Sequence, residues 1–315
     1  MNLKTSHPHI SLAQDITQAA SRQTYYTIRL LADRDRREDA YRAYAYFRWV
    51  DDRIDAETSS KAVYRDFVSR QKTLLESVSR GEAFNDATPE ENLLADLVKR
   101  DRENNSGLRS YLQHMMTVME FDAGRRGRLI SQHELNQYTH HLSSAVTEAL
   151  HHFIGHGCYA PLDESRYQAV AAAHITHMLR DTYDDIQAGY INIPREVLDT
   201  NHISPADVQS DAYRDWVRSR VELARTYFKT GRDYLARVQN FRCRLAGYAY
   251  VARFEKLLGV IEKDDYCLRP TYTDHNGLSS ILKAAGPITA SLVVYRGTTP
   301  ASPRLASQPP SQRKP

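Results

Sequence analysis

Apolar residues recur at intervals of three and four along most of this chain, which is the spacing of an amphipathic α-helix. The pattern predicts helices over residues 38–56, 61–80, 91–100, 107–121, 131–155, 162–185, 211–238 and 241–263, and a short one that begins at 204. Ser131 and Glu134 have the spacing of a capping box, and Pro205 after Ser204 suits a first helical position. No segment alternates as a half-buried strand does. We therefore expect an all-α bundle, with residues 1–275 as one domain.

The composition agrees with a folded protein of a reducing compartment. Hydrophobic residues make up 41% of the 315 positions and charged residues 26%, which is enough apolar material for a core. The chain contains neither G-x-G-x-x-G nor G-x-x-x-x-G-K-[ST], the glycine-rich patterns that bind phosphate groups. Their absence weighs against a nucleotide-binding α/β fold. Its three cysteines form no C-x-x-C pair, and residues 1–21 hold no apolar run typical of a signal peptide. We expect a cytoplasmic protein.

The charge is unevenly distributed along the chain. The net charge is +3, too small to indicate a nucleic-acid partner, and residues 275–315 hold five basic side chains and no acidic one. Residues 276–315 are expected to form a basic, largely disordered extension, because their second half is rich in Pro, Ser and Gln. The apolar stretch Ile281–Tyr295 falls short of the ~20 residues that a spanning helix needs. A peripheral membrane contact of this extension stays open as an alternative.

Two acidic clusters carry the chemical information. At about 100° per residue, Tyr44, Arg48, Asp51 and Asp55 fall within roughly 40° of one another on a helix. In the second cluster five polar residues span about 100°: His174, His177, Asp181, Asp184 and Asp185. Each cluster thus presents D-x-x-x-D on one face, among aromatic and apolar neighbours where unpaired carboxylates are costly.

A lone D-x-x-x-D is most simply a solvated acidic stripe, but two of them on separate helices change that interpretation. Facing each other, up to six carboxylates repel strongly unless cations neutralise them. Oxygen ligands of this kind select Mg²⁺ or Mn²⁺, and Mg²⁺ completes its coordination with waters and substrate phosphates. The residues therefore predict a diphosphate clamp inside a helical bundle.

The two segments resemble the squalene/phytoene synthase family, the head-to-head prenyl-diphosphate synthases. Family members pair Y-x-x-x-R-x-x-D-[DE]-x-x-D with a later N-x-x-R-D-x-x-x-D. The first is matched by Tyr44, Arg48, Asp51, Asp52 and Asp55, and the second by Arg180, Asp181 and Asp185. The sequel Gly189–Pro194 is similar to the family's G-R-x-Y-L-P, and the likeness extends from about Ser21 to Tyr266. The resemblance implies the isoprenoid-synthase helical bundle with a central cavity.

The resemblance also implies roles for individual residues. The implied catalytic residues are Asp51, Asp55, Asp181, Asp185 and Tyr44. The implied metal ligands are Asp51, Asp52, Asp55, His177, Asp181, Asp184 and Asp185. The implied diphosphate-binding residues are Arg48, Arg180, Arg22, Tyr138 and Tyr248. Mg²⁺ (or Mn²⁺) would bridge two farnesyl or geranylgeranyl diphosphates, which would be joined to a squalene- or phytoene-type polyene. Use of NADPH, substrate length and oligomeric state stay open.

The chain departs from the family pattern at two places. His174 and His177 stand where the family has Gln and Asn, and the family's Asn helps to hold metal. The helix after Ser131 reads Leu142–Thr147 where the family has V-A-G-x-V-G, so both small glycines are missing. Bulkier residues there could reshape the prenyl tunnel, so these departures affect product identity more than diphosphate chemistry.

Three other interpretations of the sequence are possible. His152 and His156 have the i,i+4 spacing of a metal pair, but no H-E-x-x-H pattern accompanies them, so solvated or hydrogen-bonded histidines are favoured over a zinc site. The same clamp could ionise a single prenyl diphosphate for cyclisation or hydrolysis. A non-catalytic lipid-binding or assembly relative is disfavoured, because both D-x-x-x-D sets are present.

Overall fold

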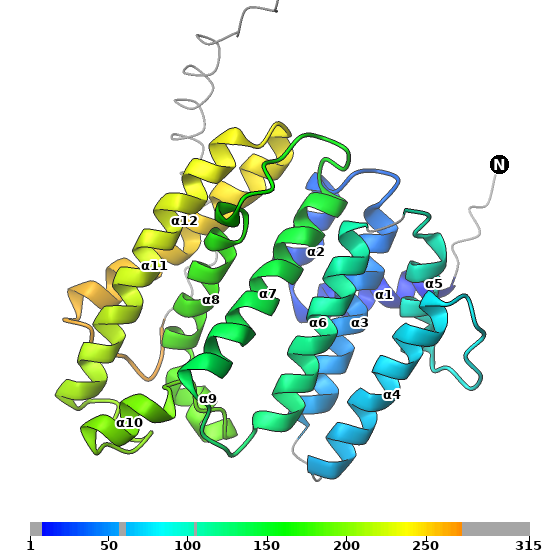
Figure 1. Ribbon diagram of the computed structural model, residues 1–315. Helices are drawn as coiled ribbons and strands as arrows, with labels where there is room; N and C mark the ends of the chain where they lie inside the picture. The colour runs from blue at the N-terminus through cyan, green and yellow to red at the C-terminus, as the bar shows by residue number, and fades with distance from the viewer. Residues whose placement is uncertain (1–7, 57–60, 104–105, 273–315) are drawn as a thin grey trace, which may run out of the picture.

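The computed structural model describes residues 8–56, 61–103 and 106–272, and the regular elements in these ranges are helices joined by turns and loops (Figure 1). The first six helices are α1 (Pro8–Ala20), α2 (Arg22–Leu31), α3 (Arg37–Asp55), α4 (Lys61–Ser79), α5 (Pro89–Arg100) and α6 (Gly107–Arg125). The remaining elements are α7 (Gln132–Phe153), the 3-10 turn η1 (Glu164–Tyr167), α8 (Gln168–Arg180), α9 (Thr182–Ala188), α10 (Arg195–Asn201), α11 (Asp211–Arg237) and α12 (Phe241–Lys263). Within the described ranges no strand forms, so the all-α prediction is confirmed.

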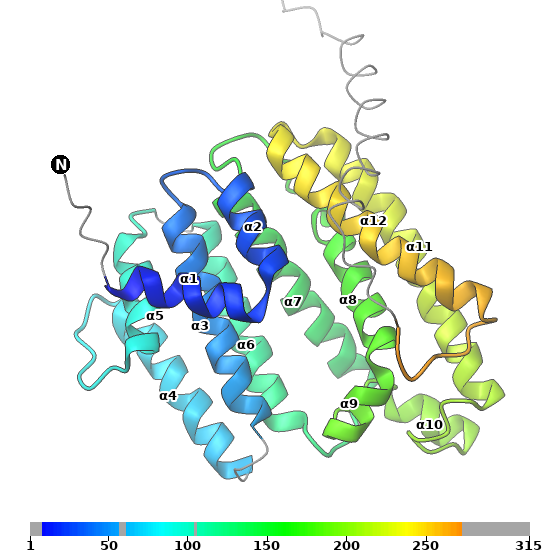
Figure 2. The same ribbon diagram turned by 180° about the vertical axis from the view of Figure 1, so that it is seen from behind.

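The long helices lie side by side around a shared apolar interior. α6 packs along α7, α8 lies between α7 and α11, and α12 packs on both α8 and α11 (Figure 1). Figure 2 shows α1 and α2 crossing the back of this array, where α1 packs on α3. The core includes large side chains that are almost completely buried, such as Leu93, Phe228 and Phe254. Burial of such side chains contributes roughly 1.5–3 kcal/mol each to folding.

A buried polar network joins α3, α4 and α5. The Tyr46 hydroxyl donates to Gln71 (3.0 Å), and the Gln71 amide donates to Glu91 (2.8 Å). Arg70 donates two hydrogen bonds of 2.8 Å to the same carboxylate. Glu91 also accepts from the backbone of Thr88 in a capping box that begins α5. A glutamate only 1% exposed is thus fully satisfied, as a buried charge must be.

Several predicted boundaries are confirmed and others are wrong. The Ser131–Glu134 capping box begins α7 as expected. The single helix predicted to run to 185 is divided at Asp181, where the Thr182 hydroxyl bonds back to the carbonyls of Met178 and Leu179. Such back-bonding bends helices.

The short helix predicted at Ser204 is wrong. Its backbone forms a turn, because the Asp207 carboxylate accepts from the Ser204 backbone N–H (2.7 Å). The helices α1, α2 and α10 were not predicted from the sequence, and the latter two are short.

None of the described helices is long and apolar enough to cross a membrane. The predicted basic extension, residues 276–315, lies outside the described residues. So does the apolar stretch Ile281–Tyr295 within it.

Candidate functional site

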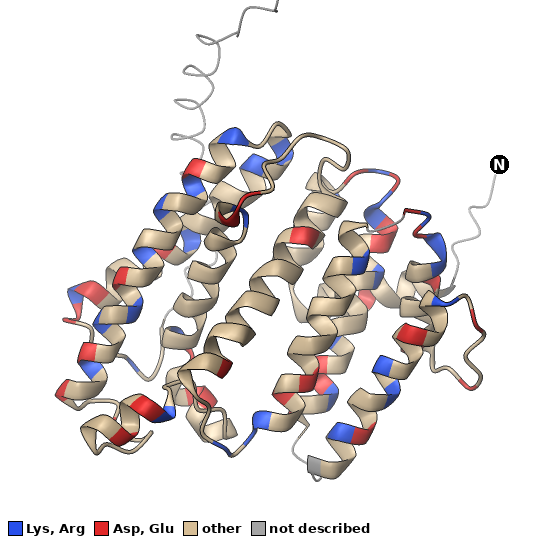
Figure 3. Ribbon diagram, viewed as in Figure 1, with Lys and Arg blue, Asp and Glu red and all other residues tan. Residues whose placement is uncertain are grey.

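The first acidic cluster lies at the C-terminal end of α3. Val50 and Ile54 on this turn are almost completely buried and define the side of the helix that faces the core. The helical period therefore places Asp51, Asp52 and Asp55 on other sides of α3, away from the core. Arg48, one turn earlier, donates to Asp51 (3.3 Å) and also bonds Asp52. Figure 3 shows acidic positions in red at this end of α3, at the neighbouring end of α6 and on α9.

The second acidic cluster lies where α8 passes into α9. The Arg180 guanidinium grips Asp181 with two hydrogen bonds of 2.6 and 2.7 Å, which is the fork geometry of arginine and carboxylate. Asp185 accepts a hydrogen bond of 2.6 Å from the Asn192 amide, whereas Asp184 is exposed to solvent.

The chain after α9 connects the two clusters. Gly189 ends α9 in the left-handed conformation (φ 87°), and its carbonyl accepts from the Gly127 backbone N–H (2.7 Å). This turn directs Tyr190 towards α3, where its hydroxyl donates to Asp55 (2.9 Å). The two acidic clusters therefore lie at the same end of the bundle.

A third carboxylate lies between the clusters, and no sequence motif predicted it. Asp122 on α6 accepts from Arg125 (2.6 Å) and from the Tyr138 hydroxyl (2.9 Å). Arg125 also donates to the Asn192 side-chain oxygen (2.7 Å), so it connects α6 to the segment that holds Asp185. The Arg125 guanidinium lies 4.8–4.9 Å from the ring centres of Tyr138 and Tyr190.

Burial and mutual repulsion leave this end of the bundle with excess negative charge. Burial raises the pKa of Asp51 to about 7; Asp55, Asp122 and Asp52 add to the rise, and Arg48 opposes it. Burial and Asp181 raise the pKa of Asp185 to about 7, against the lowering effects of Arg125 and Asn192. Asp122 contributes to both shifts, so the two clusters belong to one electrostatic unit. Such a unit favours bound cations.

The donor chemistry fits a divalent cation that prefers oxygen. The clusters offer carboxylate oxygens, which suit Mg²⁺ or Mn²⁺. In the described part of the chain, no three His, Cys, Asp or Glu side chains are grouped as a metal site. The assignment of metal ligands among the aspartates therefore stays a prediction, and any cation would need further ligands from water or substrate.

The two unusual histidines lie on α8 just before the second cluster. His174 is 8% exposed, and its ring centre lies 5.0 Å from that of Tyr138. Burial, with help from His177 and Arg125, lowers the pKa of His174 to about 3, so this ring is neutral at physiological pH. The His177 ring packs edge-on against Phe254 of α12 (4.7 Å between centres). Both rings therefore pack against aromatic side chains beside the acidic clusters. The role of His177 as a metal ligand stays a prediction.

The other predicted residues are divided between the site and the surface. Tyr138 is in the site, and Tyr44 is half-buried on α3 and acts electrostatically on Arg48. Arg22 is exposed at the start of α2. Tyr248 donates to the Arg232 carbonyl of α11 (3.4 Å). In the part of the chain that the structure describes, neither Arg22 nor Tyr248 forms a hydrogen bond with the aspartates, so their diphosphate contacts stay predictions.

The histidine pair His152 and His156 has partners of its own. His152 Nε2 lies 2.9 Å from Arg36, and His156 Nε2 lies 2.9 Å from Glu103. These contacts agree with the preference for hydrogen-bonded histidines over a zinc site.

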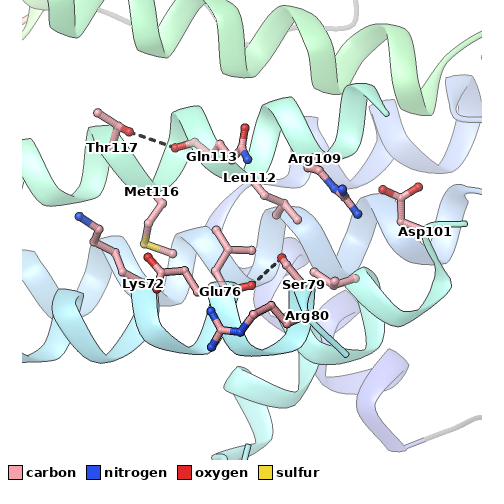
Figure 4. Close-up of a pocket in the computed structure, with 12 residues that line it drawn as sticks. Lys72, Glu76, Ser79, Arg80, Asp101, Arg109, Leu112, Gln113, Met116 and Thr117 are labelled. Atoms are coloured by element: carbon pink, nitrogen blue, oxygen red, sulfur yellow. Dashed lines mark hydrogen bonds between the residues drawn. The ribbon is translucent and has the colours of Figure 1, made fainter. Parts of the chain in front are cut away.

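A cavity of about 450 Å³ between α4 and α6 is separate from the carboxylates (Figure 4). The hydroxyl groups that line it already donate hydrogen bonds within their own helices: Ser79 donates to the Leu75 carbonyl and Thr117 to the Gln113 carbonyl. No residue of either acidic cluster lines it.

Comparison with known proteins shows which family the chain belongs to. The model of the squalene/phytoene synthase family matches residues 17–275, so the chain belongs to this family. Phytoene synthase 3 of Zea mays is 22% identical over 258 residues, which cover 78% of this chain and 57% of the relative. Phytoene synthase 2 of Solanum lycopersicum is 24% identical, with 78% of each chain covered. The chain thus spans little more than half of the maize protein's length.

Solved structures show the same fold. A dehydrosqualene synthase superposes with a TM-score of 0.69 at 16% identity, covering 91% of this chain and 97% of that one. The squalene synthase HpnC from Alicyclobacillus acidocaldarius superposes with a TM-score of 0.65 at 18% identity, covering 83% and 95%. The predicted isoprenoid-synthase helical fold is confirmed.

The missed residues had weak sequence signals. Asp122 lies near the end of a helix without a D-x-x-x-D partner, and Arg125 follows one turn later. Tyr190 and Asn192 belong to the segment Gly189–Pro194, whose likeness to the family motif indicates no role for either side chain.

Proposed function

We propose that this protein is a Mg²⁺-dependent prenyltransferase that condenses two allylic prenyl diphosphates head to head and releases diphosphate. The observation that supports this most directly is the presence of two acidic clusters at one end of the bundle, each with its own arginine, Arg48 or Arg180, in a chain of the squalene/phytoene synthase family. The aspartates carry more charge than the arginines neutralise, which suits cation-bound diphosphate.

The metal would be held by the aspartates of both clusters. The proposed ligands are Asp51, Asp55, Asp181 and Asp185, with Asp52, Asp184 and His177 as additional candidates. Bound Mg²⁺ would neutralise the diphosphate and make it a better leaving group. The pKa values of Asp51 and Asp185, raised to about 7, indicate how strongly the unliganded site resists full ionisation.

The remaining steps depend on the protein's own side chains. Arg48 and Arg180 each lie against an aspartate and would contact phosphate oxygens as charged donors. Tyr138 and Tyr190 hold Asp122 and Asp55, which fixes the carboxylates before substrate arrives. Neutral His174 adds no positive charge beside a carbocation, and the Tyr138 ring next to it presents a π-face that would stabilise one.

The test is incubation of the purified protein with farnesyl or geranylgeranyl diphosphate and Mg²⁺, with and without NADPH. Diphosphate release and mass spectrometry of the hydrocarbon are the measurements. A C30 or C40 product is expected, and the NADPH arm distinguishes squalene from phytoene or dehydrosqualene. Asp51→Asn should abolish turnover, while Asp66→Asn on the exposed surface of α4 should not change it.

Three results would overturn the proposal. Absence of diphosphate release from both substrates would exclude prenyl-diphosphate ionisation. A product with the carbon count of one substrate would replace head-to-head condensation by cyclisation or hydrolysis on the same site. Tight Mg²⁺-dependent binding without turnover would indicate a non-catalytic relative.

A further inference from the structure

A second cavity, of about 550 Å³, lies between α7, α8 and α11. Its walls come from one face of each helix, and the contributing positions recur at helical spacing. On α11 these are Trp216, Arg220, Leu223 and Tyr227. The apolar part of the wall on α7 and α8 comprises Leu135, Ala171, Ile175, Met178 and Leu179. No residue of the acidic clusters lines this cavity, so it is separate from the site described above.

Arg220 is the notable residue of this groove, because it has no anionic partner. Among the described residues it forms neither a hydrogen bond nor an ion pair, and its Nε is buried. Burial lowers the pKa of Arg220, and Tyr227 is the neighbour that opposes the shift.

Other arginines that the fold buries are paired differently. Arg42 donates to Asp39 (2.7 Å), Arg125 to Asp122 (2.6 Å) and Arg166 to Glu148 (2.7 Å). A guanidinium removed from water without such a partner is costly. In the described structure Arg220 therefore differs from these three arginines, and an anion would supply the partner that its guanidinium lacks.

A second donor lies one turn away on the same face. Trp216 is 7% exposed, and its indole N–H is buried without an acceptor in the described structure. Buried indole N–H groups ordinarily have a hydrogen-bond partner. Two unsatisfied donors, four residues apart on α11, thus border one cavity.

The composition of the lining indicates what kind of anion fits. The lining residues include no Asp or Glu, so nothing in the groove repels a negative charge. Next to the two donors, the side chains of Ile175, Met178, Leu179 and Leu223 form an apolar surface. The cavity has the size and mixed polarity of small-molecule sites.

We propose that this groove binds a fatty-acid-type ligand, a single alkyl chain with a carboxylate head. The carboxylate would accept from Arg220 and from the Trp216 indole, and the chain would lie along the apolar face of α8. This site is independent of the proposed catalytic function and does not rest on it.

Titration calorimetry of the full-length protein with decanoate tests the proposal. Acetate has the head without the chain, and decyltrimethylammonium has the chain with the opposite charge. Saturable binding of one decanoate is expected, with no binding of acetate or of the ammonium compound at the same concentrations. Equal binding of acetate would reduce the site to a simple anion site, and equal binding of the ammonium compound would show that only the chain is recognised; either result overturns the proposal.

Variants locate the binding. Arg220→Met removes the charge and should weaken decanoate at least ten-fold, and Trp216→Phe, which keeps the ring and removes the N–H, should weaken it less. The matched control is Arg218→Met on the same helix, whose guanidinium is exposed and donates to Asp215 (3.0 Å). Unchanged binding in Arg220→Met, or loss of binding in Arg180→Met instead, would place decanoate elsewhere and refute the assignment.

Discussion

The Tyr190 hydroxyl donates a hydrogen bond of 2.9 Å to Asp55, although 135 positions separate the two residues. Through this bond the segment after the second acidic cluster restrains a carboxylate of the first. Asp55 is exposed at the last turn of α3, so little else holds its orientation. The relative placement of the two clusters therefore depends on a residue that belongs to neither.

Tyr190→Phe should lower turnover of prenyl diphosphate about ten-fold without changing the fold. A hydrogen bond to a charged group contributes roughly 1.5–3 kcal/mol, and its loss lets the Asp55 carboxylate move. Steady-state kinetics with saturating Mg²⁺ measures the effect, and circular dichroism checks the helicity. Tyr159→Phe, at a tyrosine that is 66% exposed, is the matched control and should behave as the wild type. Equal rates in both variants would show that this bond is not used.

Asp185→Asn should stabilise the metal-free protein at alkaline pH while abolishing activity. The native pKa of Asp185 is raised to about 7, above its ordinary value of 3.8, so the folded state binds this proton more tightly. The stabilisation from that proton is complete below about pH 4 and is lost as the pH rises through 7.

Urea unfolding without divalent metal measures this effect. At pH 8 the variant should be more stable by roughly 1–2 kcal/mol after allowance for solvent screening, and at pH 4 the two proteins should coincide. Added Mg²⁺ should raise the melting temperature of the wild type more than that of the variant. A variant less stable than the wild type at pH 8 would contradict the repulsion argument.

His152→Gln should weaken the loss of stability in acid. Burial and Arg36 lower the pKa of His152 to about 4, so the unfolded chain binds this proton more readily between pH 6.5 and 4. The stability that neutral His152 provides is complete above pH 6.5 and is lost as the pH falls towards 4.

Glutamine keeps an acceptor for Arg36, which lies 2.9 Å from His152 Nε2, but it cannot take up a proton. Between pH 7.5 and 4.5 the free energy of unfolding should fall by about 2 kcal/mol less in the variant than in the wild type. Chemical denaturation at the two pH values is the measurement. Parallel losses in both proteins would show that His152 is already accessible to protons in the folded state.

Gly231→Ala should destabilise the protein by about 1–3 kcal/mol. A Cβ at this position of α11 would lie 2.7 Å from the Cβ of Ala169 and 2.8 Å from its backbone, at the start of α8. The control is Gly259→Ala on α12, where the nearest atom is 3.7 Å away and a gain of about 0.5–1 kcal/mol is expected from the stiffer unfolded chain. Thermal unfolding compares the two, and equal melting temperatures would mean that α8 and α11 separate easily.

The amino-acid sequence by itself determined the helical class, most of the long helices and the two acidic clusters. These features are local: apolar spacing defines a helix face, and D-x-x-x-D places two carboxylates on one side of it. The pairing of Arg48 with Asp51 and of Arg180 with Asp181 is local too, because each pair lies within four residues.

Only the tertiary structure decided how these parts meet. The roles of Asp122, Arg125, Tyr190 and Asn192 depend on contacts between α6, α7 and the chain after α9, and the raised pKa values of Asp51 and Asp185 follow from those contacts. Arg220 likewise reads in the sequence as one more charge on a helix, and only the packing of α11 on α8 shows that no carboxylate in the described structure reaches it. Burial and long-range neighbours are set by packing, because spacing along one helix carries no information about the helix that will face it.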